Sequence, residues 1–348
     1  MPLFTFAPKS ICILRLSAIG DVCHAIACVQ AIQRQWPETK ITWVTGKLEA
    51  QLVQNLANIE VISFDKKLGW KAYFQLRKQL KNHRFDALLH MQAALRSSLV
   101  SLMIKAKIKL GFDKARAKDG QWLFTNKKID TAKSSHVLDG FMAFAKRLGV
   151  QDLTVKWELQ LPAESRQKAK LLIDNKPTFI ISPAASKAYK NWTVEGYSAA
   201  ANHALKQGYQ VLICGAPTTL EKTIAEQIVN NTQQQATNLI GKTTLIELVA
   251  LIQQADILLA PDTGPTHMAT MVNTPVIGLY AHHNPKRTGP YTQLNHVVSV
   301  YEQLISRQTG KTINELPWRA RVKDTDAMQQ ISIKSVTTMF DQIIKEQE

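Results

Sequence analysis

Short, continuous apolar runs alternate with longer amphipathic stretches along most of this chain, and this alternation limits the folds open to it. In the first half, the apolar runs cover residues 11–16, 41–45, 61–64 and 87–91, with helical patterns at 21–35, 47–57, 71–82 and 96–105. Strands that are apolar at every position, rather than at every second one, are typical of a parallel sheet covered by helices on both faces. The pattern therefore predicts an α/β protein built from βαβ units.

A second series of the same kind follows an interruption. From about residue 150 to 175 the alternation lapses into a mixed polar stretch with a proline near each end, and we place the domain boundary there. Further strands are predicted at 178–182, 210–214, 238–240, 257–259 and 276–280, with helices at 195–206, 218–229, 244–254 and 264–272. We expect two Rossmann-like domains, residues 1–160 and 175–330, whose parallel sheets face a central cleft. We expect a last amphipathic helix, over 333–348, to pack back on the N-terminal domain.

Basic residues are concentrated in the N-terminal half of the chain. The 348 residues include 43 Lys and Arg against 27 Asp and Glu, a formal net charge of +16. Residues 65–134 alone contain 17 basic and 5 acidic residues. This distribution favours an anionic partner, and on charge alone nucleic acid, an anionic membrane surface and a phosphorylated substrate all fit.

The remaining composition is typical of a globular cytoplasmic protein. Hydrophobic residues make up 45% of the sequence and charged residues 20%, which excludes wholesale disorder. No apolar run reaches the roughly 18 to 20 residues needed to span a bilayer, and the first residues lack the cleavage site of a signal peptide. The cysteines form no C-x-x-C pair, so we expect buried free thiols at Cys12, Cys23, Cys28 and Cys214.

The first predicted strand ends in the segment R-L-S-A-I-G-D-V, residues 15–22, directly before a helix. Gly20 permits a tight turn from strand to helix, and Asp21 stands where an N-cap or first-turn acid is favoured. One interpretation of Asp21 is therefore structural. The other is catalytic, because the carboxyl end of a strand beside the expected cleft is where a base for deprotonating a hydroxyl would lie.

A loop of the second domain carries groups suited to a phosphorylated ligand. The segment I-S-P-A-A-S-K-A-Y-K-N-W follows a strand and supplies a hydroxyl and two ammonium groups from Ser186, Lys187 and Lys190. A diphosphate cradle and a solvated loop are both compatible with this pattern. On the same edge, G-A-P followed by Glu221 forms another strand-to-helix turn, which suits a ribose or sugar hydroxyl.

The segment A-P-D-T-G-P-T-H-M-A, residues 260–269, is the most specific pattern in the second domain. A strand runs directly into Asp262, Thr263 and Gly264, and Pro265 fits the first turn of a helix, where its missing N–H costs nothing. Exposed N–H groups at that helix end favour a phosphate, which His267 could also reach. Alternatively, Asp262 is an N-cap and His267 a structural histidine.

Taken together, these segments resemble glycosyltransferase family 9, the ADP-heptose:lipopolysaccharide heptosyltransferases, and among them heptosyltransferase I. The resemblance covers nearly the whole chain. It rests on L-R-L-S-A-I-G-D-V-x-H-A at 14–25, K-N-W at 190–192, G-A-P at 215–217, D-T-G-P-T-H-M-A at 262–269, T-P-V-I-G-L-Y at 274–280 and P-W-R-A-R at 317–321.

The resemblance implies a GT-B fold whose N-terminal domain binds the acceptor and whose C-terminal domain binds the nucleotide sugar. It implies an inverting transfer in which Asp21 is the general base, taking a proton from a Kdo hydroxyl of the lipopolysaccharide inner core as ADP departs. The implied donor-binding residues are Ser186, Lys187, Lys190, Glu221, Asp262, Thr263, Gly264, Pro265 and His267. Lysine and helix N-termini can stabilise the departing diphosphate, and we find no D-x-D pair positioned as a magnesium site, so no cofactor is expected.

The basic stretch of the first domain supplies the acceptor side. Residues expected to meet the acceptor, including the carboxylates and phosphates of Kdo and lipid A, are Ser17, Gly20, Lys66, Lys67, Lys71, Arg96, Lys114, Arg116 and Lys118. Lysine where the family often has arginine favours a different acceptor decoration, such as a phosphate. We also expect the basic stretch to associate peripherally with the cytoplasmic surface of the inner membrane.

The resemblance thus predicts a heptosyltransferase that uses ADP-L-glycero-D-manno-heptose as donor and Kdo-lipid A as acceptor. One alternative keeps the fold and acceptor class but uses a UDP-hexose or UDP-N-acetylhexosamine donor. Another alternative, suggested by the charge, is a nucleic-acid-binding module. No stacking aromatic platform, helix-turn-helix or zinc pattern accompanies the basic residues, so we expect no nucleic-acid partner.

Overall fold

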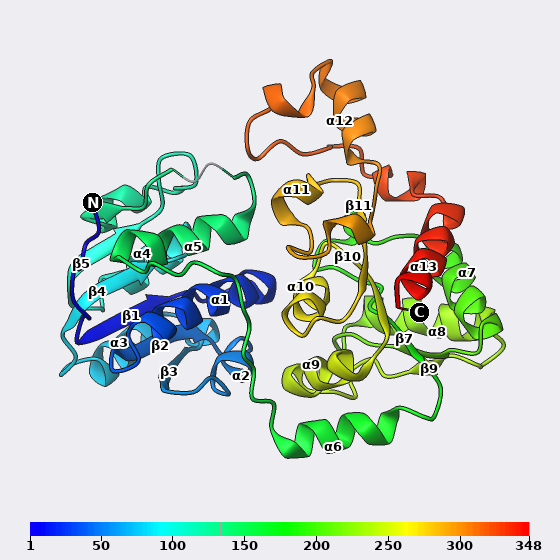
Figure 1. Ribbon diagram of the computed structural model, residues 1–348, viewed down its shortest axis with the longest axis horizontal. Helices are drawn as coiled ribbons and strands as arrows, with labels where there is room; N and C mark the ends of the chain where they lie inside the picture. Colours follow the sequence, from blue (N-terminus) through cyan, green and yellow to red (C-terminus); the bar gives the residue numbers. More distant parts are fainter. Residues whose placement is uncertain (132–133, 348) are drawn as a thin grey trace. The chain divides into compact units, whose positions relative to one another are not determined.

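Each half of the chain folds around its own six-stranded parallel sheet. The protein is described by a computed structural model that covers residues 1–131 and 134–347. Contacts divide the chain into two units between Gln160 and Leu161, and helices flank the strands in both (Figure 1). The α/β class predicted from the apolar runs is therefore confirmed.

The N-terminal sheet has the strand order β3-β2-β1-β4-β5-β6. Its strands are β1 (Ser10–Leu14), β2 (Lys40–Gly46), β3 (Ile59–Phe64), β4 (Phe85–His90), β5 (Ala106–Gly111) and β6 (Lys127–Lys128). Its helices are α1 (Ile19–Gln35), α2 (Ala50–Val53), α3 (Trp70–Gln79), α4 (Leu95–Ser101) and α5 (Val137–Leu148), with the 3-10 helices η1 (Lys66–Leu68) and η2 (Gln121–Phe124). The order reverses between the neighbours β1 and β4. Such a reversal opens a crevice at the carboxyl ends of the two strands, where α/β proteins bind ligands.

Side chains on both faces of this sheet are buried, as the continuous apolar runs predict. On one face, Leu14 of β1 packs in a cluster with Leu76 of α3 and Val100 of α4. Ile11 and Ile13 are also fully buried, and they face the other side because successive strand residues alternate. Each such side chain contributes roughly 1.5 to 3 kcal/mol by leaving water.

The C-terminal sheet repeats this topology with the order β12-β11-β10-β7-β8-β9. Its strands are β7 (Thr178–Ile181), β8 (Gln210–Ile213), β9 (Thr237–Asn238), β10 (Ile257–Pro261), β11 (Val276–Tyr280) and β12 (Val297–Ser299). Its longer helices are α6 (Ala163–Leu172), α7 (Val194–Lys206), α8 (Thr219–Asn231), α9 (Leu245–Gln254), α10 (Gly264–Met271), α12 (Tyr301–Thr309) and α13 (Ile333–Gln347). The short ones are α11 (Pro285–Thr288), η3 (Ala188–Lys190), η4 (Leu294–His296), η5 (Ile313–Glu315) and η6 (Ala327–Gln330). Here the reversal lies between β7 and β10.

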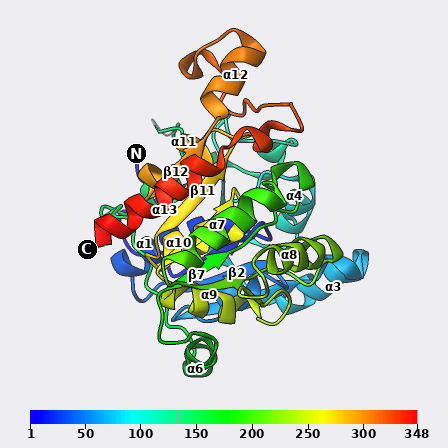
Figure 2. The ribbon, with the colours of Figure 1, turned by 90° about the vertical axis from the view of Figure 1, so that its right-hand side faces the viewer.

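The last helix, α13, packs on the C-terminal sheet beside α7 (Figure 2). The ring of Phe340 lies 5.0 Å from that of Phe179 in β7 and 5.1 Å from that of Tyr209. Asp341 of α13 bonds to His203 of α7 at 2.6 Å. The apolar stripe of α13 thus completes the C-terminal core, which corrects the expectation that this helix packs back on the N-terminal domain.

All nine strands expected from continuous apolar runs occur, with ends displaced by at most two residues. Three further strands, β5, β6 and β12, were not predicted. In β5 lysines alternate with apolar residues, and β6 and β12 are only two and three residues long. Helix α6 occupies the stretch expected to be a linker. It was not predicted because its many charged residues hide a short buried face that includes Ala169.

The four cysteines are buried free thiols, as predicted. Burial raises the pKa of Cys23, Cys28 and Cys214 to about 12, so these thiols are protonated at neutral pH. Among residues 1–131 and 134–347, no helix has the length and apolar character needed to cross a membrane.

A buried histidine in the N-terminal sheet gives the first testable prediction. His90 ends β4, and the Gln121 amide donates to its Nδ1 at 3.2 Å and to its carbonyl at 2.8 Å. Burial, with the nearby charges of Lys109 and Arg15, lowers the pKa of His90 from 6.5 to about 4. The unfolded chain therefore binds a proton at His90 below about pH 6.5, whereas the folded chain does so only near pH 4. The free energy of unfolding is unaffected by this group above pH 6.5 and falls by about 3 kcal/mol as the pH drops to 4.

We expect the free energy of unfolding to fall between pH 7 and 4 by about 3 kcal/mol more in the wild type than in His90→Gln. Denaturant titrations at each pH measure this difference, and a constant loss of stability in the variant does not affect it. Parallel pH curves for the wild type and His90→Gln would contradict the prediction.

Candidate functional site

Asp21 lies where the strand order of the N-terminal sheet reverses. It is in the first turn of α1, just beyond the end of β1. The N-cap is Ala18, without a side-chain cap, so Asp21 is not the N-cap but the first-turn acid that the structural interpretation also allowed. Its carboxylate pairs with the guanidinium of Arg15 and keeps 34% of its side-chain surface exposed. The carboxylate is thus both held and open to a ligand.

Arg15 is a buried cation that fixes Asp21 from the sheet side. Its Nη1 donates to the carbonyl of Met91, which follows β4, and its guanidinium lies 5.4 Å from the centre of the Phe141 ring. Burial lowers the pKa of Arg15, and the carboxylates of Asp21 and Glu49 counter part of that shift. Sequence reasoning missed both Arg15 and Glu49, although Arg15 stands within the predicted motif.

The loop before α1 is held by the ends of neighbouring strands. Gln92 accepts from the Leu16 N–H at 2.7 Å, and its amide donates to the Ser17 hydroxyl at 3.3 Å. At Gly46 a Cβ would collide with the Glu49 carboxylate and the Leu16 carbonyl, so only glycine fits. Two predicted acceptor residues therefore lie within a few residues of Asp21: Ser17 in this fixed loop and Gly20 in the first turn of α1.

The predicted basic acceptor residues lie in two different environments. Six are exposed: Lys66, Lys67, Lys71, Arg96, Lys114 and Lys118. Arg116 is instead only 6% exposed, and it bonds to the Asp113 carboxylate at 2.7 Å and to the Ser134 carbonyl at 3.0 Å. This buried pair stabilises the unit itself, which corrects the expectation that Arg116 meets the acceptor.

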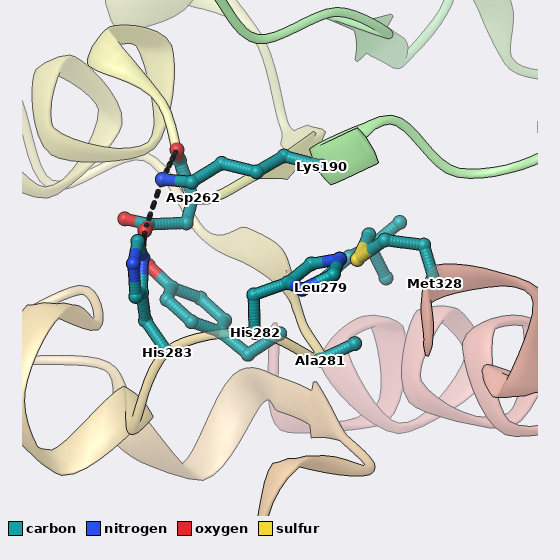
Figure 3. A pocket seen from close by; sticks show the side chains of 8 residues that line it. Lys190, Asp262, Leu279, Ala281, His282, His283 and Met328 are labelled. Carbon is teal, nitrogen blue, oxygen red and sulfur yellow. Dashed lines mark hydrogen bonds and ion pairs between the residues drawn. The ribbon is translucent and has the colours of Figure 1, made fainter. Parts of the chain in front are cut away.

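In the C-terminal unit, Lys190 and Asp262 meet at the reversal between β7 and β10. Lys190 ends η3, in the loop after β7, and Asp262 directly follows β10. The Lys190 ammonium donates to Asp262 Oδ2 at 2.8 Å, and both side chains are largely buried, with 17% and 14% exposed (Figure 3). The structure thus brings together two groups that the sequence placed 72 residues apart.

His283 also binds Asp262, and sequence reasoning missed it. Its Nδ1 donates to the same Oδ2 at 2.8 Å. Burial would raise the pKa of the Asp262 carboxyl, but the His283 hydrogen bond and the Lys190 charge outweigh burial and hold that pKa well below its ordinary value. Both bonds are on Oδ2, and among the described residues no hydrogen bond to Oδ1 of this carboxylate is seen.

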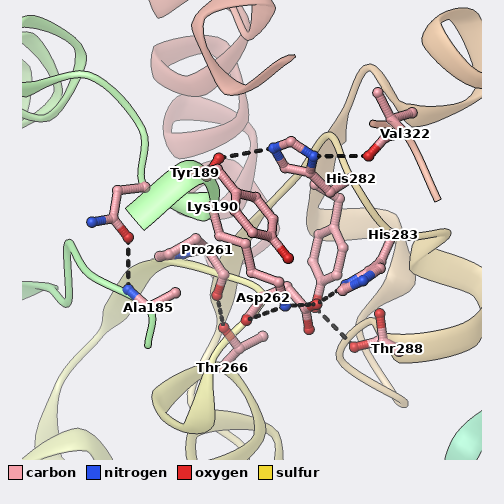
Figure 4. Close-up of polar contacts among 12 residues, drawn as sticks. Ala185, Tyr189, Lys190, Pro261, Asp262, Thr266, His282, His283, Thr288 and Val322 are labelled. Carbon is pink, nitrogen blue, oxygen red and sulfur yellow. Dashed lines mark hydrogen bonds and ion pairs between the residues drawn. The ribbon is translucent and has the colours of Figure 1, made fainter. Parts of the chain in front are cut away.

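A pocket lies beside Lys190 and Asp262, and residues at the end of β11 and in η6 also line it. Its lining residues are Lys190, Asp262, Leu279, Tyr280, Ala281, His282, His283 and Met328. The buried His282 lies 2.8 Å from the Tyr189 carbonyl through Nε2 and 3.2 Å from the Val322 carbonyl through Nδ1 (Figure 4). It therefore ties the Lys190 loop to the segment that follows P-W-R-A-R.

Helix α10 begins beside Asp262 with its first turn open. Thr263 is the N-cap but makes no side-chain cap bond, and its hydroxyl is buried without a hydrogen-bond partner in the described structure. Pro265 occupies the first turn, as predicted. Thr266 donates from its hydroxyl to the Pro261 carbonyl at 2.7 Å, which fixes the turn (Figure 4). N–H groups at such a helix end suit an anion; Gly264 is half-buried and His267 is buried here.

The other predicted donor residues differ in how firmly they are held. Ser186 and Lys187 are exposed, in a loop that Asn191 closes by accepting from the Ala185 N–H at 2.8 Å. Glu221 accepts from the Ala216 N–H at 2.7 Å and so holds the turn after β8. Burial raises the pKa of Glu221, while hydrogen bonds from Ala216 and Thr218 limit the shift.

Comparisons with known proteins identify the family of this chain. The family model described as glycosyltransferase family 9 (heptosyltransferase) matches residues 73–317. The lipopolysaccharide core heptosyltransferase OpsX of Haemophilus influenzae is 50% identical over 337 residues, which cover 97% of each chain. Lipopolysaccharide heptosyltransferase 1 of Escherichia coli K12 is 24% identical over 80% of this chain and 90% of its own.

Solved structures share the fold at lower identity. A glycosyltransferase family 9 protein from Veillonella parvula has a TM-score of 0.79 at 21% identity, with 97% of each chain covered. Escherichia coli heptosyltransferase WaaC, solved with ADP, has a TM-score of 0.76 at 18% identity, with 96% of this chain and 99% of that one covered. These likenesses confirm the GT-B fold that the sequence resemblance implied.

Proposed function

Because this chain belongs to glycosyltransferase family 9 (heptosyltransferase), a family of transferases, we propose that it moves a heptose from ADP-heptose to a Kdo hydroxyl of the lipopolysaccharide inner core. The relative OpsX is named for heptose transfer to the lipopolysaccharide core, and WaaC was solved with ADP and with ADP-2-deoxy-2-fluoro heptose. The observation that carries the proposal is the Lys190, Asp262 and His283 cluster at the strand-order reversal, beside the open N-terminus of α10.

The donor's diphosphate would lie against the positive groups of this cluster. The Lys190 ammonium and the first N–H groups of α10 stabilise negative charge as it builds up on the departing ADP. The buried Thr263 hydroxyl, which lacks a protein partner in the described residues, suits a phosphate oxygen. Asp262 presents Oδ1 to a sugar hydroxyl, while Ser186, Lys187, Gly264, Pro265 and His267 complete the proposed phosphate side. Glu221 is the proposed ribose or sugar contact.

Asp21 is the proposed general base for the acceptor. Its carboxylate takes the proton of the Kdo hydroxyl as that oxygen bonds to the anomeric carbon of the heptose. The bond from that carbon to the diphosphate breaks on the opposite face, and ADP leaves with its electron pair, so the anomeric configuration inverts. Arg15 orients the carboxylate through its fixed contacts with Met91 and Phe141.

The exposed charges near Asp21 would bind the acceptor. Kdo-lipid A carries carboxylates and phosphates, which the exposed side chains of Lys66, Lys71, Arg96 and Lys118 can meet. Ser17, in the loop before α1, and Gly20, in the first turn of α1, are close to Asp21 in the chain. Such an acceptor is anchored in the inner membrane, so we propose that the protein works peripherally at its cytoplasmic surface.

Incubation of the purified protein with Kdo-lipid A and candidate donors tests the proposed function. We expect ADP-heptose to increase the acceptor's mass by one heptose residue, as measured by mass spectrometry. Parallel incubations with a UDP-hexose and a UDP-N-acetylhexosamine identify a different donor if one is used. A mass increase only with a UDP-sugar would overturn the assignment of ADP-heptose as donor. No mass increase with any donor would overturn the assignment of Kdo-lipid A as acceptor.

His283 gives a second testable prediction. His283→Ala removes one of the two donors to Asp262 Oδ2, and a hydrogen bond to a charged group is worth about 1.5 to 3 kcal/mol. We expect kcat/KM for the donor to fall roughly tenfold or more. The change should come mainly through KM, because the His283 side chain acts through Asp262. His283→Asn retains an N–H donor and should recover most of the loss; equal kinetics for His283→Ala and the wild type would contradict the prediction.

A further inference from the structure

Several large apolar side chains of the N-terminal unit are exposed, and those near its two exposed tryptophans form two groups. The first, which we call the α3 corner, consists of Leu68, Trp70 and Phe74, with 42%, 72% and 72% of their surfaces exposed. The second, the η2 tip, consists of Trp122 and Leu123, at 68% and 75%. Side chains of this size and exposure are costly in water unless they are covered by a partner.

The α3 corner is built by the amphipathic pattern of its helix. Helix α3 buries Ala72 and Leu76 against the sheet, so Trp70 and Phe74, four residues apart, share the outward face. Arg77 and Lys78 follow one turn later and are exposed. The Trp70 ring leans on Tyr73, with ring centres 5.4 Å apart, so it is held in place rather than free in solvent.

Both apolar groups lie at the edge of the sheet that carries Asp21. Residue 66, where η1 begins, comes two residues after β3 ends at Phe64, and α1 with Asp21 follows the end of β1. Gln121, the first residue of η2, bonds to the carbonyl of His90 at the end of β4 and to the N–H of Phe112 just after β5. Since β3 and β5 lie on opposite sides of β1 in the sheet, the two groups flank Asp21.

Exposed basic side chains stand close in the sequence to each apolar group. Residues 65–81 contain six Lys and Arg against one Asp, and all six are exposed: Lys66, Lys67, Lys71, Arg77, Lys78 and Lys81. Around the η2 tip, the exposed lysines are Lys114, Lys118, Lys127 and Lys128. Exposed tryptophan within a lysine-rich surface matches the interface of an anionic bilayer, where indole rings lie at head-group depth and ammonium groups meet lipid phosphates.

We propose that the α3 corner and the η2 tip are the membrane-contacting surface of this protein, with their aromatic and leucine side chains inserted at the head-group level of an anionic bilayer. Nucleic acid fits less well, because Leu68, Phe74 and Leu123 are apolar groups that gain from hydrocarbon rather than from phosphate. The surface deepens the proposed function, on which it rests, because it would bring Asp21 to the level where the sugar of a lipid-anchored acceptor lies.

Vesicle binding by Trp70→Ser/Phe74→Ser tests the proposal. The probe is vesicles of phosphatidylcholine with about one third phosphatidylglycerol, and binding is measured by co-sedimentation. We expect the double variant to bind roughly tenfold or more weakly than the wild type, because two interfacial aromatic contacts are lost. Binding of the wild type should weaken as salt rises and on pure phosphatidylcholine. Brominated lipids should quench wild-type tryptophan fluorescence, and less so in Trp70→Phe.

The matched control is Leu171→Ser, a residue 77% exposed on α6 of the C-terminal unit, which should bind vesicles like the wild type. Equal binding by Trp70→Ser/Phe74→Ser and the wild type, or equal losses in the double variant and the control, would overturn the proposal. Transfer to a deacylated, water-soluble Kdo acceptor is measured in parallel and should be unchanged in the double variant. If even the wild type shows no such transfer while vesicle binding behaves as expected, the proposed function fails and the membrane surface stands.

Discussion

Asp21→Asn should lower kcat by about 10²- to 10⁴-fold, the range that a general base contributes. The amide keeps the size of the carboxylate, and its oxygen can still accept from Arg15, so the loop before α1 should keep its fold. An amide cannot take up the proton of the acceptor hydroxyl, however, and the attacking oxygen would remain a weak nucleophile. Initial rates at saturating ADP-heptose and Kdo-lipid A measure the effect, while KM for the donor should change little.

Asp65→Asn is the matched control for this experiment. Asp65 follows β3 at the same edge of the sheet, and its carboxylate is 26% exposed, close to the 34% of Asp21. It accepts from the Lys67 N–H at 2.9 Å and so holds η1. We expect kcat to stay within about threefold of the wild type, since a surface substitution of this kind usually costs under about 0.5 kcal/mol. A normal rate for Asp21→Asn would remove Asp21 from the proposed mechanism.

The fold and much of the candidate site could be predicted because the polar groups directly follow apolar runs. Lys190 and Asp262 come after strands of one parallel sheet, and the carboxyl ends of parallel strands meet at one edge. His283 also follows a strand of this sheet, β11, which lies next to β10, but it stands outside the motifs that the sequence singled out. A sequence shows that a strand ends shortly before His283, but not which strand is its neighbour.

Arg116 shows the limit of reasoning from net charge. Residues 65–134 are strongly basic, and counting cannot separate a surface cation from one that is buried against an acid. Asp113 stands three residues before Arg116, yet many such pairs lie on exposed helices. Here the pair is buried, and Arg116 also donates a hydrogen bond to the Ser134 carbonyl. Long-range packing, which leaves no local pattern, decides between the two outcomes.

Lys190→Ala should lower kcat/KM for the donor by about 10²- to 10³-fold. Removal of one preorganised group that stabilises developing negative charge costs about 2.7 to 4 kcal/mol, and Lys190 is the ammonium that the structure fixes at this pocket, 2.8 Å from Asp262. Its loss also leaves Asp262 with only His283 on Oδ2, so donor binding should weaken as well. Steady-state kinetics with ADP-heptose and a direct titration with ADP separate the two effects.

Asp262→Asn and the Lys190→Ala/Asp262→Asn double variant decide whether Lys190 acts on the donor or only on Asp262, with Lys206→Ala as the control. Lys206→Ala removes an exposed ammonium from the last turn of α7 and should leave the kinetics unchanged. If Lys190 only braced Asp262, then Asp262→Asn would cost as much as Lys190→Ala, and the double variant no more than either. Because Lys190 also faces the diphosphate in the proposed mechanism, we expect ADP itself, which has no sugar for Asp262 to hold, to bind at least tenfold more weakly to Lys190→Ala than to Asp262→Asn. Equal ADP affinity in the two variants would assign Lys190 to the support of Asp262 alone.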